Sequence, residues 1–351
     1  MTTKLMSTIA LVGLLGLAGC ASGSEPVLDV DESAASSEST SGADSGITVD
    51  ANLWPLTGLP LEGGDPNLPS LAAKIDNHPL ARPQVGLDQV DIVFEELVEG
   101  GITRYVAVWH STLPEEIGPV RSVRPMDPDI VSPFGGILAY SGGQQRFIEA
   151  MLDAPVASAI HGQSDVQDFF YRSTTTTAPH NVIVRAPDLV AYFADRAGPA
   201  PQFNFAPNTE ASSAASAGEE LASMRVLLSS FSAPSWEWSG EDGVFYRSQT
   251  NGAADLAISG EQISADNVVV LFVDIQVIQD IPTTNLVDQG EGYVATGGKY
   301  LPIRWSKSAS DQPIELTDGS GARILLAPGH TWIELVPAAG SGVPEGIVTI
   351  Q

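Results

Sequence analysis

The first half of the chain alternates short apolar runs with segments of helical spacing. Four runs have the alternation and β-branched residues of strands, namely "DIVFEEL", "RYVAVWH", "GILAYSG" and "HNVIVRA". Two segments are spaced as helices, "GQQRFIEAML" and "PDLVAYFADRAG", and the second has Pro187 at its first position and Gly198 at its end. This order predicts an α/β (or α+β) N-terminal domain over residues 51–206.

Helical spacing fades in the second half, where strands and glycine-containing turns follow one another. Segments such as "MRVLLSSFS", "NVVVLFVDIQVI" and "TWIELVP" are typical of strands, and "GEDG", "TGGK" and "TDGSG" are typical of hairpin turns. We expect a mainly β C-terminal domain over residues 224–351, with a core of its own. The Ala- and Ser-rich residues 207–223 are expected to bridge the two domains, although their second half could form a helix.

The first twenty residues, "MTTKLMSTIALVGLLGLAGC", have the layout of a secretory signal peptide. Lys4 precedes an apolar stretch that is too short to remain as a membrane span. The residues "LAGC" resemble a bacterial lipobox, whose cysteine is acylated and becomes the new amino terminus. An ordinary cleavable signal with an incidental thiol is the alternative. We therefore expect a protein anchored to the cell membrane through lipid on Cys20, on the extracytoplasmic face.

Composition adds a tether and limits the partners. Residues 21–50 are small, polar and acidic with no aromatic residue, so we expect a disordered tether. The chain has 16 basic and 43 acidic residues, a formal net charge of −27, which argues against nucleic acid as a partner. An anionic ligand must therefore meet a local group of basic residues. Cys20 is the only cysteine, so no disulfide within the chain is expected.

Three arginines, Arg104, Arg121 and Arg124, are concentrated in the segment "GITRYVAVWHSTLPEEIGPVRSVRP". Prolines on both sides of "VRSVR" disfavour a helix, and an extended segment would place Ser122 and Arg124 on one face and Arg121 on the other. One hypothesis is a site for a phosphate or carboxylate built from Arg124, Ser122 and Arg104, which Arg121 would join only if the segment forms a turn. The alternative is that the arginines form structural ion pairs with nearby acidic residues, namely Glu95, Glu96, Glu99, Asp127 or Asp129.

Four further residues are candidates for chemistry. Glu96 lies on an apolar strand face, so it needs a partner or a raised pKa, and Arg104 on the following strand is the expected partner. Ser141 lies in "SGGQQ", where backbone donors at a helix start suit an anion. His180 and Asn181 precede a strand, at a place suited to the edge of a site. His180 and Glu96 are weak catalytic candidates, and a purely structural role is the alternative for each.

No motif in the chain indicates a metal or a cofactor. The histidines show neither His-x-His nor His-Glu-x-x-His spacing, so no metal site and no cofactor are predicted. The segment "SGGQQ" lacks both the lysine of a P-loop and the Gly-x-Ser-x-Gly pattern of a serine hydrolase. These observations leave both nucleotide binding and serine hydrolysis without a signature.

Long, ordered segments of the chain resemble one family. They are "KIDNHPLARPQVGLDQVDIVFEELVEGGITRYVAVW", "EEIGPVRSVRPMDPDI", "GGILAYSGGQ", "TAPHNVIV" and "DGSGARILLAPGHTWIELVP". They are similar to the YerB-like bacterial lipoproteins, whose N-terminal and C-terminal parts are known as domain of unknown function 3048. The resemblance covers nearly the whole body from Trp54 to Pro337. It implies a surface-anchored, two-domain lipoprotein, and it brings no catalytic residues.

Two functions from different classes remain open. In the first, the protein binds an anionic component of the cell envelope, such as a cell-wall precursor, a glycan or a partner protein, in an arginine-containing cleft. In the second, it is an envelope hydrolase or transferase in which His180 is the base and the arginines stabilise a developing anion. The sequence shows no nucleophile–base pair, which favours the first. A serine or carboxylate of the arginine cleft within hydrogen-bond reach of His180 would reverse that preference.

Overall fold

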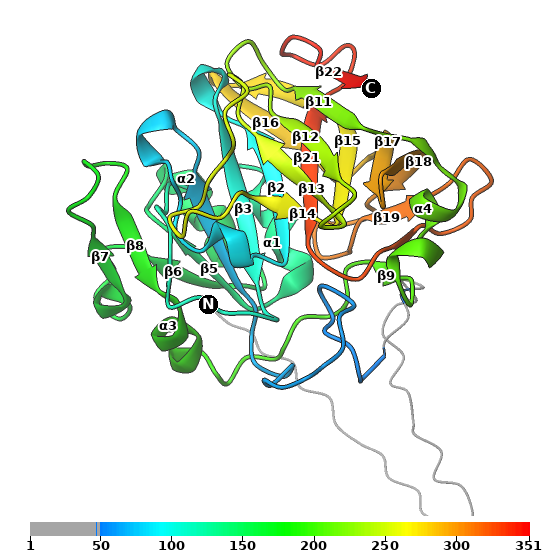
Figure 1. Cartoon of the computed structure of the whole chain (residues 1–351). Coiled ribbons are helices and arrows are strands. Elements are labelled where there is room, and N and C mark those ends of the chain that lie inside the picture. Colours follow the sequence, from blue (N-terminus) through cyan, green and yellow to red (C-terminus); the bar gives the residue numbers. More distant parts are fainter. Residues whose placement is uncertain (1–46, 48–49) are drawn as a thin grey trace, which may run out of the picture. The chain divides into compact units, whose positions relative to one another are not determined.

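The computed structural model describes residue 47 and residues 50–351 (Figure 1). The predicted signal segment with Cys20, and all of the tether except residues 47 and 50, lie outside the described residues. The predictions made for those segments therefore stay predictions. In the described part of the chain, no helix is both long and apolar enough to cross a membrane.

The N-terminal domain contains five strands of a large sheet, a small three-stranded sheet and three short helices. The elements are β1 (Leu71–Asp76), β2 (Ile92–Leu97), β3 (Thr103–Trp109), β4 (Glu116–Ile117), α1 (Asp127–Val131), β5 (Ile137–Tyr140), α2 (Gln145–Asp153), β6 (Ala157–Ile160), β7 (Phe170–Arg172), β8 (Val182–Arg185) and α3 (Ala186–Tyr192). The predicted α/β class is confirmed. The second predicted helix is shorter than expected, because Phe193 has φ −106° and ψ 24° and leaves the helical region.

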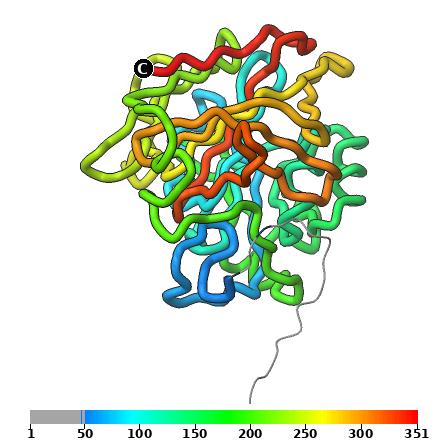
Figure 2. Tube along the Cα trace, turned by 90° about the vertical axis from the view of Figure 1, so that its right-hand side faces the viewer, coloured from blue at the N-terminus to red at the C-terminus, as the bar shows by residue number. Residues whose placement is uncertain are grey.

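The C-terminal domain is mainly β, as predicted. After α3, strand β9 (Asn204–Phe205) lies at the end of the N-terminal domain and β10 (Glu219–Glu220) in the bridge. The strands of the C-terminal domain are β11 (Ser223–Leu227), β12 (Ser235–Ser239), β13 (Val244–Ser248), β14 (Ser264–Ala265), β15 (Asn267–Ile278), β16 (Ile281–Asn285), β17 (Gln289–Thr296), β18 (Lys299–Ser306), β19 (Glu315–Thr317), β20 (Leu325–Leu326), β21 (Thr331–Pro337) and β22 (Ile347–Ile350). Strands β14, β13, β12, β11 and β22 form a separate sheet in that order. In Figure 2 the red end of the chain, β22, runs beside β11.

One strand of the C-terminal domain joins the two domains into a single sheet. Strand β21 lies between β15 and β2 and pairs parallel with both, so the sheet order is β10-β18-β17-β15-β21-β2-β3-β1-β5-β6 (Figure 1). The buried hydrophobic clusters on the two faces of this sheet each contain residues from both domains. This differs from the expectation of two separate cores. The two domains differ in fold class, but both contribute residues to the same two hydrophobic clusters.

The segment between the domains also packs on the sheet. It contains the short helix α4 (Ser213–Ala217), whose N-cap is the side chain of Ser212. Strand β10 then pairs with β18 at the edge of the sheet, through Glu219 opposite Tyr300. Residues 207–223 therefore include the helix that their composition allowed.

Alternation along the central strands separates two sets of polar residues. On one face, Tyr105 and Trp332 pack with Trp236 of the five-stranded sheet. Val106 belongs to the cluster on the other face, which includes buried residues of α1 and α2. Because neighbouring residues of a strand point to opposite faces, Glu95 lies on the side of the five-stranded sheet. The charged residues on the helix side are Lys74, Asp76, Glu96 and Arg104, since Lys74 lies opposite Val106 in register and Arg104 lies opposite both Asp76 and Glu96.

Candidate functional site

The segment that contains Arg121, Ser122 and Arg124 extends the central sheet beyond the end of β5. Arg121 N donates to Lys74 O at 2.7 Å, and Ser141 N donates to Arg121 O at 2.9 Å. The segment is therefore extended, as its prolines predicted. It inserts between the end of β1 and the loop after β5, and so brings its arginines to the ends of the central strands.

Asp76, the last residue of β1, is the centre of a charged cluster. Its Oδ2 atom lies 2.6 Å from Nδ1 of His180 and forms an ion pair with Nε of Arg121 at 3.1 Å. Its Oδ1 atom accepts from His78 N at 3.0 Å. The Asp76 side chain is buried, whereas that of His180 is 11% exposed and that of Arg121 is 21% exposed. The cluster therefore reaches the surface through the histidine and the arginine.

His180 is held in a defined orientation. A carboxylate on Nδ1 fixes the ring and leaves Nε2 as the nitrogen that can exchange a proton with a ligand. The ring of His78 stacks on that of His180, with 4.5 Å between centroids and 17° between planes. The pKa of His78 is lowered by burial and by the neighbouring His180. Two imidazoles thus lie side by side next to an arginine.

Arg104 differs from the other two arginines because no carboxylate of the described part of the chain forms an ion pair with it. Arg124 pairs with Glu99, from Nε to Oε2 at 2.7 Å. Arg104 donates from NH1 to Ser122 O at 2.7 Å, and its buried Nε atom has no partner among the described residues. Its pKa is lowered to about 10 by burial and by the charges of Arg124 and Arg121. Arg104 and Arg124 both donate to Ser122 O, whereas Arg121 pairs with Asp76, which lies opposite Arg104 in the register of β1 and β3.

Glu96 has a different partner from the one expected. Lys74 Nζ contacts Glu96 Oε1 and lies 2.7 Å from Asp127 Oδ1, and all three side chains are fully buried. The expectation that Arg104 would pair with Glu96 is therefore wrong. Burial and the charge of Asp127 raise the pKa of Glu96 to about 7, while Lys74 opposes the shift. Glu96 has no exposed surface for the catalytic role considered for it.

The remaining predicted residues divide between the arginine cluster and its surroundings. Ser122 Oγ donates to Ser141 O at 3.1 Å, so both serines lie at the cluster. Asn181 turns away, because its amide donates to Ser173 O at 3.0 Å and accepts from Arg172 at 2.8 Å. The structure thus brings together Arg104, Arg121, Ser122, Arg124, Ser141 and His180.

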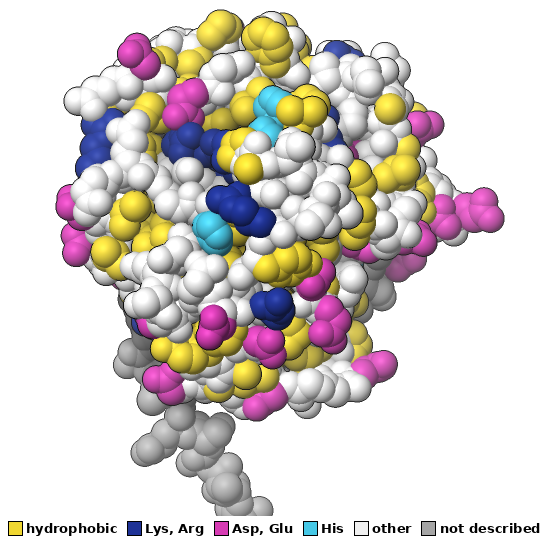
Figure 3. Space-filling view, turned by 90° about the vertical axis from the view of Figure 1, so that its left-hand side faces the viewer, with side chains coloured by type: hydrophobic (Ala, Val, Ile, Leu, Met, Phe, Trp, Pro, Cys, Tyr) yellow, Lys and Arg dark blue, Asp and Glu magenta, His cyan; other side chains and the backbone are white. Residues whose placement is uncertain are grey.

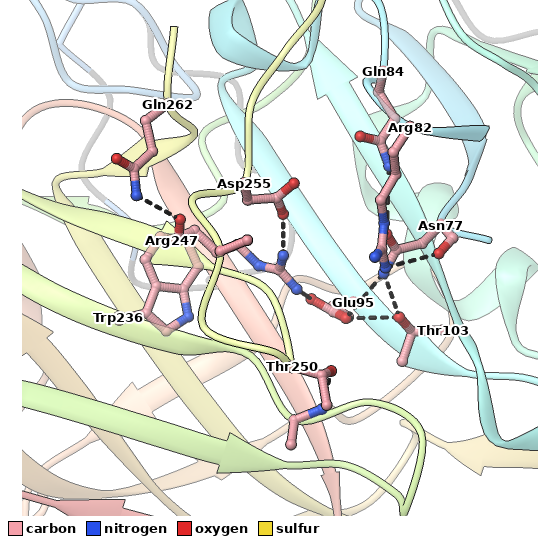
Figure 4. Close-up of polar contacts among 12 residues, drawn as sticks. Asn77, Arg82, Gln84, Glu95, Thr103, Trp236, Arg247, Thr250, Asp255 and Gln262 are labelled. Carbon is pink, nitrogen blue, oxygen red and sulfur yellow. Dashed lines mark hydrogen bonds and ion pairs between the residues drawn. The ribbon is translucent and has the colours of Figure 1, made fainter. Parts of the chain in front are cut away.

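A second polar network crosses from β2 to the five-stranded sheet (Figure 4). Arg247 NH2 lies 2.7 Å from Glu95 Oε2, and Arg247 NH1 also contacts Asp255. Thr103 Oγ1 donates to Glu95 Oε1 at 2.7 Å and accepts from the Asn77 amide at 2.7 Å. This network fixes the residues that follow β1.

Sequence reasoning missed Asp76, Asn77, His78 and Arg82. Their signal was the polar run in "KIDNHPLARP", which directly follows the apolar start of β1.

Figure 3 shows Lys and Arg side chains beside two histidine side chains on the face that is to the left in Figure 1. Among the residues that the structure describes, no group of three or more His, Cys, Asp or Glu side chains is arranged to hold a metal ion.

The fold and the site define a protein with an α/β domain and a mainly β domain that complete one sheet around buried charged clusters. The family model "Protein of unknown function (DUF3048) N-terminal domain" matches residues 56–200, and the corresponding C-terminal model matches residues 224–333. The chain belongs to this DUF3048 family, which confirms the resemblance seen in the sequence.

Two comparisons give the extent of the similarity. The chain is 28% identical to "Putative lipoprotein YerB" of Bacillus subtilis (strain 168) over 304 residues, which are 84% of this chain and 89% of that protein. It is also similar to the crystal structure of YerB protein from Bacillus subtilis, with a TM-score of 0.70 and 23% identity. That match covers 85% of this chain and 99% of the other, and it shows the fold.

Proposed function

We propose that this chain is a lipid-anchored protein of the cell envelope that binds an anionic envelope ligand at the Arg104 cluster, which consists of Arg104, Arg121 and Arg124. The anchor is supported by the lipobox-like residues before Cys20 and by the similarity to a protein named as a lipoprotein. It is tested by labelling cells with a fatty-acid analogue. The wild-type chain should be labelled and Cys20→Ala should not, whereas a labelled Cys20→Ala variant would contradict the anchor.

The observation that carries the binding proposal is the guanidinium of Arg104. A buried charge is costly unless it is paired, and among the described residues the guanidinium of Arg104 hydrogen-bonds only to a backbone carbonyl. Burial and the charges of Arg124 and Arg121 lower the pKa of Arg104, while Asp76 and Glu99 partly oppose that shift. An anion bound beside these arginines would offset both costs. Such a site is suited to phosphates and carboxylates, because guanidinium groups bind planar or tetrahedral oxyanions with paired hydrogen bonds.

The test is denaturant unfolding of the full chain in detergent, with phosphate or with chloride at matched ionic strength. An anion that binds only the folded state stabilises it by about 2.7 kcal/mol at 100 times its Kd. Phosphate should stabilise the wild type more than chloride does, and Arg104→Gln should lose that difference. Arg225→Gln is the matched control, because Arg225 is exposed on β11. Equal responses of the wild type and Arg104→Gln would overturn the proposal.

One observation favours the second candidate, an envelope hydrolase or transferase, and it meets the condition set from the sequence, because the carboxylate of Asp76 lies within hydrogen-bond reach of His180. We keep binding as the first candidate because Asp76 orients the histidine and supplies no nucleophile–base pair. The 2.6 Å contact between His180 and Asp76 is the arrangement that orients a histidine as a general base. The neighbouring arginines could stabilise a developing negative charge. Among the described residues, no hydroxyl side chain hydrogen-bonds the His180 ring, so the base would act on water or on a substrate hydroxyl.

The two candidates are separated by His180→Gln. The enzyme candidate requires the wild type to turn over a chromogenic probe such as bis-p-nitrophenyl phosphate or p-nitrophenyl acetate, and His180→Gln to lose that activity. The binding candidate requires His180→Gln to keep the stabilisation by phosphate. Wild-type turnover that disappears in His180→Gln, without any phosphate stabilisation, would favour the enzyme over the binding protein.

A further inference from the structure

A pocket of about 540 Å³ lies next to the Arg104 cluster but shares none of its arginines. His78 separates the two, because it lines the pocket and stacks on His180. Residues from both domains form the walls. They come from the segment after β1, from the start of β3, from the loop between β11 and β12 and from the turn after β13, and include Asn77, Arg82, Thr103, Phe231, Gln249 and Asn251.

Arg82 gives this pocket a fixed positive charge. Its Nε atom donates to Asn77 Oδ1 and its NH2 group to Asn77 O, both at 2.9 Å. Among the described residues, no carboxylate lies within ion-pair distance of Arg82. Asn77 is itself held by Thr103, which is bonded to Glu95. Asn77 therefore orients the guanidinium of Arg82 without neutralising its charge. The remaining N–H donors of Arg82 are available to an anion.

An aromatic ring is exposed at the edge of the same pocket. Phe231 is 70% exposed, the largest fraction among the large apolar side chains of the described residues. Its loop is fixed, because Phe231 N donates to Ser229 Oγ at 3.0 Å and Ser229 Oγ contacts Gly101 O. Gly101 has φ +72°, and a Cβ atom there would lie 2.8 Å from the Phe231 ring. The absence of a side chain at Gly101 therefore leaves space for the exposed ring of Phe231.

Neutral polar groups complete the lining. Gln249 Nε2 is buried and has no hydrogen-bond partner among the described residues. Buried donors are normally paired, so this atom indicates a missing partner, a water molecule or a ligand. Asn251 and Thr250 lie beside it, and Thr250 Oγ1 accepts from Ala233 N at 2.9 Å. The pocket therefore combines one unneutralised cation, uncharged hydrogen-bonding side chains and one exposed aromatic face.

We propose that this pocket binds a saccharide that carries a carboxylate. The carboxylate would pair with Arg82, the sugar hydroxyls with the amide and hydroxyl side chains, and the apolar C–H face of the ring with Phe231. A neutral apolar ligand would leave the cation and the amides unpaired, and a bare anion would leave Phe231 exposed. This inference does not depend on the Arg104 cluster, because Arg82 and Phe231 have no part in it.

The test uses matched ligands and NMR titration of the full chain in detergent. Glucuronate should bind at least about tenfold tighter than glucose, which corresponds to one charged hydrogen-bonded contact. Arg82→Gln should remove that difference, while Arg104→Gln and Arg225→Gln keep it. N-acetylmuramate and N-acetylglucosamine form a second matched pair, which distinguishes an amino sugar from a uronic acid as the source of the carboxylate.

A second variant keeps the test valid if Arg82→Gln does not fold. Phe231→Ala changes an exposed ring and should leave the unfolding midpoint unchanged, but it should weaken glucuronate binding about tenfold, a typical effect for an aromatic anchor. Ile347→Ala, at another exposed apolar residue, is its control. The proposal is overturned if neither acidic sugar binds, if glucose binds as well as glucuronate, or if acetate competes as well as the sugar acid.

Discussion

Arg247 and Glu95 form a buried ion pair, with 2.7 Å between NH2 and Oε2, although they are 152 positions apart in the sequence. Arg247 lies in β13 of the five-stranded sheet, and Glu95 lies in β2 of the N-terminal domain. The guanidinium also lies over the ring of Trp332, at 5.0 Å from its centroid. Since Trp332 is in β21, the Arg247 side chain links the five-stranded sheet to one strand from each domain in the large sheet.

Removing Arg247 should therefore destabilise the whole protein. Arg247→Met leaves the carboxylates of Glu95 and Asp255 buried without a cation, and loss of one partner of a buried pair costs about 3–5 kcal/mol. Urea unfolding should show a lower midpoint in a single transition. The same change at the exposed Arg225 should cost less than about 0.5 kcal/mol. A midpoint for Arg247→Met equal to that of the wild type would contradict this role.

The shared sheet predicts that neither domain is stable alone. Residues 51–206 expressed without the C-terminal domain leave the edge of β2 unpaired, because its neighbour β21 is missing. Both hydrophobic clusters are also cut. We expect this fragment to give poorly dispersed NMR spectra without a cooperative thermal transition, and addition of residues 207–351 to restore the transition. A cooperative transition of the fragment alone would show that it has a sufficient core.

The sequence predicted the elements of this fold better than their arrangement. Strand β21 was evident in "TWIELVP", because its alternation is local. Its position between β15 and β2 depends on pairing between residues far apart in the chain, which no local pattern records. The same limit explains the error at Glu96. A partner on the adjacent strand was expected, whereas Lys74 reaches it from β1, on the far side of β3.

The candidate site was predictable to a similar extent. The concentration of Arg104, Arg121 and Arg124 is visible in the sequence, and the structure brings these arginines together. Asp76 was missed, because a single aspartate at the end of a strand has no distinguishing pattern. Its contact with His180 links residues 104 positions apart. Tertiary structure brings together ionisable residues that are far apart in the chain. A sequence therefore shows which ionisable residues are present more readily than which of them form pairs.

The raised pKa of Glu96 predicts a specific dependence of stability on pH. The pKa rises from an ordinary value of 4.5 to about 7 in the folded protein, chiefly through burial. Between these values the folded state binds the proton more tightly than the unfolded state does, so the free energy of unfolding falls as the pH rises. Denaturant unfolding at pH 5 and pH 7.5 should show this fall in the wild type. It should be smaller in Glu96→Gln and unchanged in Glu237→Gln, an exposed control. Equal pH dependence in the wild type and Glu96→Gln would contradict the shift.

Arg104 and Lys74 should respond to substitution in opposite ways, although both are buried cations on the same face of the sheet. Lys74→Met leaves Glu96 and Asp127 without their cation and should cost about 3–5 kcal/mol. Arg104→Met leaves no carboxylate behind. It removes one donor from Ser122 O, which costs about 1–3 kcal/mol if the oxygen is left unpaired.

However, Arg124 NH1 also donates to Ser122 O, at 3.3 Å, so that oxygen keeps a partner in Arg104→Met. Loss of the buried charge and of its repulsion by Arg121 and Arg124 acts in the stabilising direction. The free energy of unfolding of Arg104→Met should therefore stay within about 1 kcal/mol of the wild-type value. Stabilisation by phosphate should disappear at the same time, because the variant lacks the guanidinium that would bind the anion in the folded state. Urea unfolding of both variants with and without phosphate checks the contrast. A loss of stability in Arg104→Met as large as that in Lys74→Met would show that Arg104 is structural and would remove the basis for an anion site.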